Sequence, residues 1–520
     1  MRRSIRTAIA KIAPTLGLVA GIAGVAAGQA LEQQIISPSL GTTTQNFGRG
    51  VATKGDVMVA GSPSDDTNGA NAGAAYVYRY NATTHSWTYE AQLMPSDPEV
   101  GANFGVMTAV DGDIAVVGAY LEDNAKGTDA GAVYVFRRNS STGVWAQEQK
   151  LTPSVGAGND QYGFTVSLVG TVLLVGAPYA DTANGTDSGL VYVYRYKNSI
   201  VKWAEETTLV DPSGGASDWA GWSLAFDGAT AVVGSPTEEN PGFADSGTVG
   251  VWTVSGTTWT QTAELAATSI QNYSWFGSAV GVSGDQIVVG ARYLDITGVT
   301  DAGGAYFFSK ASGTWTQTGL ITNPDPSISD QFGQSAAMSG KLAVVGSYLD
   351  NAFGRTDSGM AYTFRKGKGN KGWFLDQDLA ASDGANYDGF AVAMACSDEH
   401  IVIGGYANDT TSGTDWGAVY AFDADEINLR ITPTSPLPGE TMTVSIYDGE
   451  ENAPVLLVVD EVDGFPVFIE IVTFVFGADH RLTFDTDAEN PLLGFNVGVT
   501  AWKISPTGPV VSSERVHVDV

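Results

Sequence analysis

The stretch Phe104–Ala119, which reads FGVMTAVDGDIAVVGA, decides the fold because it recurs at regular intervals along the chain. Three glycine series mark the copies. The first is Gly48, Gly105, Gly163, Gly221, Gly277, Gly333 and Gly389. The second is Gly61, Gly118, Gly176, Gly234, Gly290, Gly346 and Gly404, and the third is Gly73, Gly131, Gly189, Gly247, Gly303, Gly359 and Gly417. Self-similarity at a fixed period is typical of repeat architectures, so the pattern predicts seven copies of one unit.

Each copy reads as four strands. In the second copy, residues 104–110 and 113–118 meet at an Asp-Gly turn, which suits the positive φ angles of a tight hairpin. Residues 132–136 alternate between apolar and polar positions, as a half-buried strand does. The fourth strand begins at a tryptophan in six copies: Trp87, Trp145, Trp203, Trp259, Trp315 and Trp373. Four antiparallel strands per unit predict an all-β, seven-bladed β-propeller, in which these tryptophans pack between blades.

The seventh copy ends near Phe422, after its third strand. The missing piece lies at the other end of the chain, where 31–35 resembles 148–151. We expect the N-terminal strand to pair as the outer strand of the last blade, which closes the ring without a free edge. The propeller is therefore predicted to span residues 31–426.

These landmarks resemble the FG-GAP repeats of the integrin α-subunit head. The Phe-Gly landmark stands at 47–48, 104–105, 276–277 and 332–333, and the Gly-Ala-Pro landmark at 176–178. The resemblance covers about residues 44–425. It implies a seven-bladed propeller of a kind used by extracellular binding and adhesion proteins.

Two features depart from the integrin pattern. Integrin repeats often carry a calcium loop between the two landmarks, whereas this chain has a two-residue turn there, such as Gly112-Asp113. A turn that short does not wrap an ion, so that calcium site is not transferred. The fourth copy also loses its aromatic landmark and reads Ala220-Gly221-Trp222.

The composition bears on compartment and partners. Residues 1–30 read as a secretory signal, with Arg2 and Arg3 before an apolar run and small residues at 28–30, so a secreted or extracytoplasmic location is expected. The formal net charge of −31 argues against a nucleic-acid partner. The single cysteine, Cys396, excludes an intramolecular disulfide. No later segment is long and apolar enough to span a bilayer.

The loop between the second and third strands carries paired acidic or amide residues six positions apart. The pairs are Asp65/Asn71, Asp123/Asp129, Asp181/Asp187, Glu239/Asp245, Asp295/Asp301, Asn351/Asp357 and Asp409/Asp415. Equivalent loops share one rim of a propeller. Oxygen ligands on such loops suit Ca²⁺, and the alternative is that each side chain caps its own loop backbone.

Five tyrosines follow the glycine of the second strand and are expected on the same rim: Tyr120, Tyr179, Tyr293, Tyr348 and Tyr406. They are candidates for stacking on sugar rings or for receiving side chains of a protein partner. The alternative is packing between neighbouring blades.

Catalytic motifs are scarce. The four histidines are scattered, and no nucleophile elbow, zinc-protease motif or phosphate-binding loop stands in a fitting context. The sequence therefore predicts that the chain is not an enzyme. A carboxylate pair for glycoside hydrolysis remains an alternative among the 57 acidic residues.

Past residue 426 the repeat stops. Prolines at 433, 436 and 438 mark a junction, and strand-like runs follow up to Val520. Residues 427–520 are predicted to form a small β-sandwich of immunoglobulin-like type.

The leading functional hypothesis is a secreted or cell-surface binding or adhesion protein that presents one propeller rim to a protein or glycan partner, with Ca²⁺ as a candidate ion. Two alternatives stand beside it. One is a carbohydrate-active enzyme that uses rim carboxylates, and the other is a structural module of the cell envelope.

Overall fold

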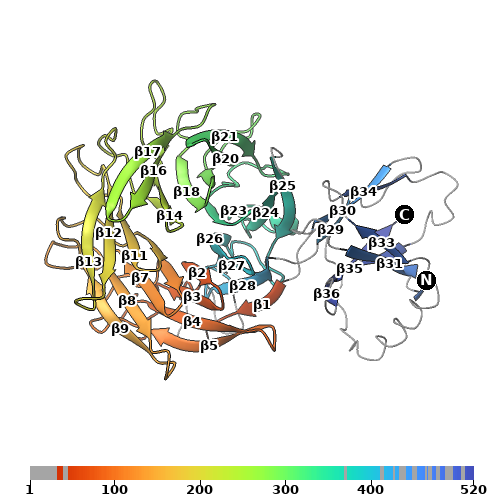
Figure 1. Ribbon diagram of the computed structural model, residues 1–520, viewed down its shortest axis with the longest axis horizontal. Coiled ribbons are helices and arrows are strands. Elements are labelled where there is room, and N and C mark those ends of the chain that lie inside the picture. The colour runs from red at the N-terminus through yellow and green to blue at the C-terminus, as the bar shows by residue number, and fades with distance from the viewer. Residues whose placement is uncertain are drawn as a thin grey trace.

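The computed structural model contains seven four-stranded antiparallel sheets arranged as blades around a central channel, which confirms the predicted all-β propeller (Figure 1). The structure describes residues 32–38, 45–367, 372–409 and 415–424, together with the backbone of eight strands between 428 and 519. The predicted signal segment 1–30 lies outside the described residues.

The strands of each blade follow from the channel outward. The first three blades are β2 (Val51–Lys54), β3 (Val57–Ser62), β4 (Ala74–Asn81), β5 (Ser86–Leu93); β6 (Thr108–Asp111), β7 (Ile114–Ala119), β8 (Ala132–Arg138), β9 (Trp145–Leu151); and β10 (Thr165–Val169), β11 (Val172–Ala177), β12 (Leu190–Lys197), β13 (Lys202–Leu209). The next three are β14 (Ser223–Phe226), β15 (Thr230–Ser235), β16 (Thr248–Ser255), β17 (Thr258–Leu265); β18 (Phe276–Ser283), β19 (Gln286–Ala291), β20 (Gly304–Ala311), β21 (Thr314–Ile321); and β22 (Ser335–Ser339), β23 (Leu342–Ser347), β24 (Met360–Lys366), β25 (Trp373–Leu379). The seventh is β26 (Phe390–Cys396), β27 (His400–Gly405), β28 (Ala418–Asp423) and β1 (Glu32–Ile36). A short 3₁₀ helix, η1 (Ala352–Gly354), lies between β23 and β24.

The N-terminal strand β1 pairs with β28 and completes the seventh blade, as the sequence predicts. The register differs by one residue from the predicted match, because Ile36 rather than Ile35 takes the place of Leu151. Ile36 is 3% exposed and Ile35 is 36% exposed. A one-residue slip turns every side chain of a strand to the other face, so burial of Ile36 fixes the register.

The closing strand is joined to the first blade by the same pair of hydrogen bonds that joins the second blade to the third. The Gln34 amide accepts from the Trp87 backbone N–H at 2.7 Å and donates to the Trp87 carbonyl at 3.0 Å. Gln149 makes the same pair of bonds with Trp203, both at 3.0 Å. The ring closure therefore reproduces an ordinary blade junction.

Backbone contacts between paired glycines hold neighbouring blades together. A Cβ at Gly61 would lie 1.7 Å from the Gly105 carbonyl oxygen, and one at Gly118 would lie 2.3 Å from that of Gly163. The pairing continues around the ring and closes with Gly404 against Gly48. Real Cβ atoms do not approach that closely, so the repeated glycines of the sequence are required by blade packing.

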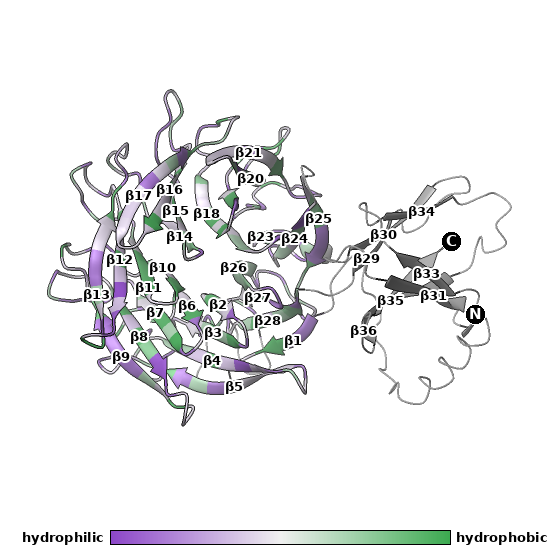
Figure 2. Ribbon diagram, in the orientation of Figure 1, coloured by the Kyte–Doolittle hydropathy of each residue, from purple (hydrophilic) through white to green (hydrophobic). Residues whose placement is uncertain are grey.

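The core lies between blades, where apolar residues of adjacent sheets meet. The inner strands are mainly hydrophobic and the outer strands carry more hydrophilic residues (Figure 2). In six blades the aromatic landmark packs against a tyrosine of the third strand, as Phe104 packs against Tyr134 with ring centroids 5.4 Å apart; five of these pairs meet edge to face and one, in the sixth blade, is tilted. In the fourth blade both positions change together, to Ala220 and Gly250.

The predicted glycine alignment is wrong in the seventh copy. Phe390 packs against Tyr420 as Phe332 packs against Tyr362, so Ala391, not Gly389, is the equivalent of Gly333. Ala391 has a φ of 70°, in the left-handed region, and is fully buried. A Cβ is unfavourable in this conformation by about 1–2 kcal/mol.

Eight further strands form two sheets after the propeller. Strands β29 (Asn428–Thr432), β30 (Thr441–Tyr447) and β34 (Arg481–Asp485) form one sheet. The other contains β31 (Pro454–Val462), β32 (Phe465–Pro466), β33 (Ile471–Val475), β35 (Asn496–Ile504) and β36 (Val510–Asp519). The immunoglobulin-like label and the boundary at 426 stay predictions. No helix of the described residues is long and apolar enough to cross a membrane.

Substitution Ala391→Gly is expected to stabilise the protein by about 1 kcal/mol, because it removes a side chain from a left-handed residue. The measurement is the free energy of unfolding in urea. Ala393→Gly in the same strand is the matched control and is expected to destabilise by about 0.5–1 kcal/mol. Equal destabilisation by both changes would contradict the assignment of Ala391 to the glycine position.

Glu32 in the closing strand β1 is expected to make the stability of the protein depend on pH. Burial raises the pKa of Glu32 to about 7, and Asp383 adds to this, while the Ser382 N–H that Glu32 accepts acts in the opposite direction. A carboxyl with a raised pKa in the folded state contributes stability below its unfolded pKa, and this contribution is lost as the pH rises through about 7.

We therefore expect Glu32→Gln to raise the unfolding temperature more at about pH 8 than at about pH 5. Glutamine suits the position because Gln147 and Gln317 accept the equivalent backbone N–H in other blades, at 2.8 and 3.0 Å. The unfolding temperature of the parent is subtracted from that of the variant at each pH, which cancels the contributions of the other titrating groups. The same difference at both pH values would show that Glu32 does not titrate in this window.

Candidate functional site

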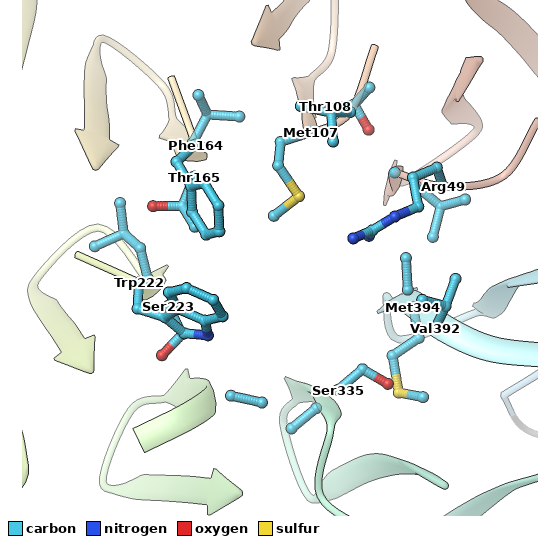
Figure 3. A pocket seen from close by; sticks show the side chains of 18 of the residues that line it. Arg49, Met107, Thr108, Phe164, Thr165, Trp222, Ser223, Ser335, Val392 and Met394 are labelled. Carbon is cyan, nitrogen blue, oxygen red and sulfur yellow. The ribbon is translucent and has the colours of Figure 1, made fainter. Parts of the chain in front are cut away.

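A cavity of about 290 Å³ occupies one end of the channel and is lined by residues from all seven blades. Its walls come from the first strand of each blade, joined by Tyr120 from the end of β7. Arg49, Phe164 and Trp222 extend into it from three different blades (Figure 3). Each first strand begins, and each second strand ends, at this end of the blade, so the loops with the predicted acidic pairs surround the cavity.

The residue after the Phe-Gly landmark differs from blade to blade. These seven cavity-lining positions are Arg49, Val106, Phe164, Trp222, Ser278, Gln334 and Val392. Blade packing constrains all seven copies in the same way and would favour similar side chains at this position. It does not explain why the seven residues include a cation, aromatic rings, an amide, a hydroxyl and aliphatic groups. Variation on a rigid repeated scaffold is typical of a recognition surface.

An aromatic cluster from the third to fifth blades adjoins the cavity and contributes Phe164 and Trp222 to its wall. Trp219 and Trp222 stack with ring centroids 5.5 Å apart and planes 22° apart. Trp275 meets both rings edge on, at 5.6 and 5.7 Å. Phe164 lies 4.9 Å from Trp222 and continues the cluster into the cavity wall.

Two of these tryptophans have an unfavourable backbone conformation. Trp219 has a φ of 56° and Trp275 a φ of 53°. The equivalent residues of four other blades have the same conformation, with φ of 53–55°: Asn46, Asn103, Gln161 and Gln331. The left-handed residue is therefore a feature of the repeat. Asparagine tolerates this region better than bulky residues do, so the tryptophans are retained at a cost in stability.

Arg292 lies behind the aromatic cluster. Its guanidinium carbon is 4.3 Å from the centre of the Trp275 ring and 5.8 Å from that of Trp222. It donates to the Gln334 amide oxygen at 2.6 Å, and burial lowers its pKa. The cation fixes the positions of both tryptophans through their ring faces.

The five predicted tyrosines all lie around the mouth, half-buried, in two groups. Tyr120 and Tyr179 flank Phe164, at 5.7 and 6.4 Å. Tyr293, Tyr348 and Tyr406 lie near one another on the other side. Burial raises the pKa of Tyr348, against the influence of the nearby Arg292 and Arg49. Three follow the strand-two glycine by two residues, whereas Tyr179 and Tyr293 follow it by three.

Hydroxyl groups line the deeper part of the cavity. Those of Thr165, Ser223 and Ser335 donate to backbone carbonyls of the next blade at 2.8, 2.7 and 2.6 Å. Thr108 and Ser278 donate to carbonyls at 3.4 and 3.3 Å. Each hydroxyl proton is committed to a carbonyl, and the Ser278 oxygen also accepts the Arg292 backbone N–H at 3.3 Å. The remaining lone pairs of these oxygens are hydrogen-bond acceptors.

The acidic pairs organise the loops around the mouth. In five copies the first member accepts the backbone N–H of the second at 2.9–3.1 Å, as Asp181 accepts from Asp187. The second member always has a positive φ of 43–52°. Its carbonyl accepts the N–H of the left-handed residue at the next blade, so Asp187 holds Trp219 and Asp245 holds Trp275, both at 3.3 Å. These pairs therefore support the strained tryptophans.

Two pairs differ from the prediction. In the first copy Asp66, not Asp65, accepts from Asn71, at 2.8 Å. Asp65 is fully buried and accepts from the Tyr76 hydroxyl at 2.6 Å, as Glu122 accepts from Tyr134 at 2.7 Å. Between Glu239 and Asp245 the described residues show no such bond.

Burial and the neighbouring Asp181 raise the pKa of Asp187, and Asp295 acts likewise on Asp301. The remaining calcium candidates, Asp123, Asp129, Asp357, Asp409 and Asp415, lie on the same rim. Within the described part of the chain, no three His, Cys, Asp or Glu side chains are grouped so that they could hold a metal ion.

The sequence missed Trp219, Trp222, Trp275, Arg49 and Arg292. Their signal is present in the repeat, because Trp222, Arg49 and Arg292 each differ in type from the residues of most other copies. Trp219 and Trp275 share one position, at which four other copies carry an amide residue. A comparison of equivalent positions for departures, instead of for regularity, would have identified them.

Substitution Asp181→Asn is expected to leave the free energy of unfolding nearly unchanged, because Asn351 accepts the same N–H at 3.1 Å in the sixth blade. Asp181→Ala removes the acceptor and is expected to cost about 1 kcal/mol. Thermal unfolding of both variants in EDTA and in millimolar Ca²⁺ checks this. Loss of a calcium-dependent stabilisation in Asp181→Asn would instead indicate that the carboxylate binds an ion.

Comparison with protein families finds the FG-GAP repeat at residues 31–78, 87–136, 145–194, 203–251, 259–308, 315–364 and 373–422. The chain belongs to the FG-GAP repeat family. Each match begins in an outer strand and ends in the third strand of the following blade, so the first match contains the closing strand β1. No match to the curated proteins was found.

Solved structures with the same fold are distant in sequence. A candidate 6-phosphogluconolactonase from Bacteroides fragilis is 12% identical, with a TM-score of 0.42, over 65% of this chain and 83% of that one. A periplasmic gluconolactonase from Pseudomonas aeruginosa is 16% identical, with a TM-score of 0.42, over 65% and 86%. Sqt1 from Saccharomyces cerevisiae is 9% identical, with a TM-score of 0.41, over 76% and 99%.

The prediction that this chain is not an enzyme is corrected and not kept, because two of these similar structures carry the names of lactonases. The likeness itself assigns no activity to this chain.

Proposed function

We propose that this FG-GAP repeat protein is a secreted or surface-exposed binding protein that holds a glycan at the mouth of its propeller channel. One observation carries the proposal: the repeat symmetry that governs the rest of the ring is broken at the residues that line the cavity and its mouth. The replacements are rigid aromatic groups, which provide broad contact area at low entropic cost.

The chemistry of the cavity favours a sugar. Phe164, Tyr120 and Trp222 form an aromatic wall against which a sugar ring can stack. The channel hydroxyls act as acceptors, and the many O–H donors of a saccharide complement them. The volume of about 290 Å³ lies near the lower end of ligand pockets and suits one or two sugar units.

Binding is tested by calorimetry of the purified protein with a panel of mono- to tetrasaccharides. Trp222→Ala is expected to weaken binding of a saccharide ligand at least about tenfold, which corresponds to about 1.4 kcal/mol. Trp259→Ala, on the outer strand β17, is the matched control and is expected to leave binding unchanged.

Other outcomes would support other functions. Release of product from a bound saccharide would favour the carbohydrate-active enzyme. A calcium-dependent rise in unfolding temperature without any soluble ligand would favour the structural module. Binding to a protein partner that survives Trp222→Ala would place recognition outside the cavity.

A further inference from the structure

The cavity contains one charged residue in a strongly acidic protein. The chain has 57 acidic residues and a formal net charge of −31. No aspartate or glutamate lines the cavity in the described part of the chain, and Arg49 is its single charged residue there. This local reversal of charge is not explained by blade packing, since the six equivalent positions hold neutral residues.

The Arg49 guanidinium has no protein partner among the described residues. It points into the cavity (Figure 3). The described ion pairs of arginines in the blades are those of Arg79, Arg137, Arg138, Arg195 and Arg365, and each of these lies on an outer part of a blade. A guanidinium presents a rigid fork of donors that matches the two oxygens of a carboxylate.

Arg49 faces the aromatic wall across the cavity. Phe164 and Trp222 lie on one side and Arg49 lies on the other (Figure 3). A second cation, Arg292, lies behind Trp222, and both arginines are close enough to influence Tyr348. The cavity therefore combines a ring-stacking surface with a positive end, a combination that matches a ligand with both a ring and an anion.

We propose that the cavity selects an acidic sugar, with the anionic group paired to Arg49 and the sugar ring stacked on Phe164 and Trp222. This inference rests on the proposed glycan-binding function and names the substrate class of the same site. The net charge of −31 and the acidic pairs around the mouth oppose an anionic ligand less at physiological ionic strength, because exposed charges are largely screened beyond roughly 8 Å.

The experiment compares uronic-acid disaccharides with their methyl esters, which have nearly the same shape and no charge. Calorimetry with the full chain is expected to show at least one acid bound about tenfold or more tightly than its ester. Arg49→Gln is expected to remove this preference while leaving ester binding unchanged, and Arg49→Lys is expected to retain part of it. Disaccharides of neutral sugars that carry a sulfate ester form a further arm of the experiment. They show whether the preferred anion is a carboxylate or a sulfate.

The outcomes separate the two proposals. Equal binding of acids and esters, or a preference that survives Arg49→Gln, would overturn the acidic-sugar assignment and leave glycan binding intact. Absence of binding by every saccharide would overturn both, as would an acidic peptide that binds in an Arg49-dependent manner when no saccharide does. The unfolding temperatures of both variants establish whether they are folded. If Arg49→Gln does not fold, the comparison of acid and ester binding by Arg49→Lys still tests the proposal.

Discussion

The close approach of backbones between adjacent blades is the constraint on which the rest of the structure depends. The Gly61 Cα lies against the carbonyl of Gly105, and the same contact recurs around the ring to Gly404 and Gly48. A side chain at these positions would separate the inner strands and open the channel. Because the contact fixes how the blades are spaced, it also fixes the size of the cavity at the centre.

The same constraint separates structural from functional positions. Residues that hold blades together repeat with few exceptions. Ala391 replaces one glycine, and Asn71 replaces one of the left-handed aspartates that Asp187 represents. Residues that face the cavity are free of that demand and vary. The fourth blade shows both effects: it loses the aromatic landmark at Ala220 together with its partner at Gly250, and it supplies Trp219 and Trp222 to the mouth.

The acidic loops illustrate how one motif supports several interpretations. Spacing alone was compatible with calcium ligands or with loop caps. In the structure, carboxylates such as that of Asp123 accept backbone N–H groups, and the paired residue aims its carbonyl at the next blade. The acidic pairs, which repeat in the blades, thus hold in place the residues around the mouth of the cavity, which differ from blade to blade.

The sequence by itself determined the number of blades, their four strands and the closure of the ring by the N-terminal strand, which it placed at 31–35, because glycine spacing and strand alternation are local signals that repeat seven times. It did not determine the register of β1 or the equivalence of Ala391, since a shift of one or two residues preserves the local pattern and only burial in the assembled ring distinguishes the alternatives. The cavity was likewise decided by tertiary structure. Arg49, Phe164 and Trp222 are far apart in the chain, and only the closed ring brings them to one site.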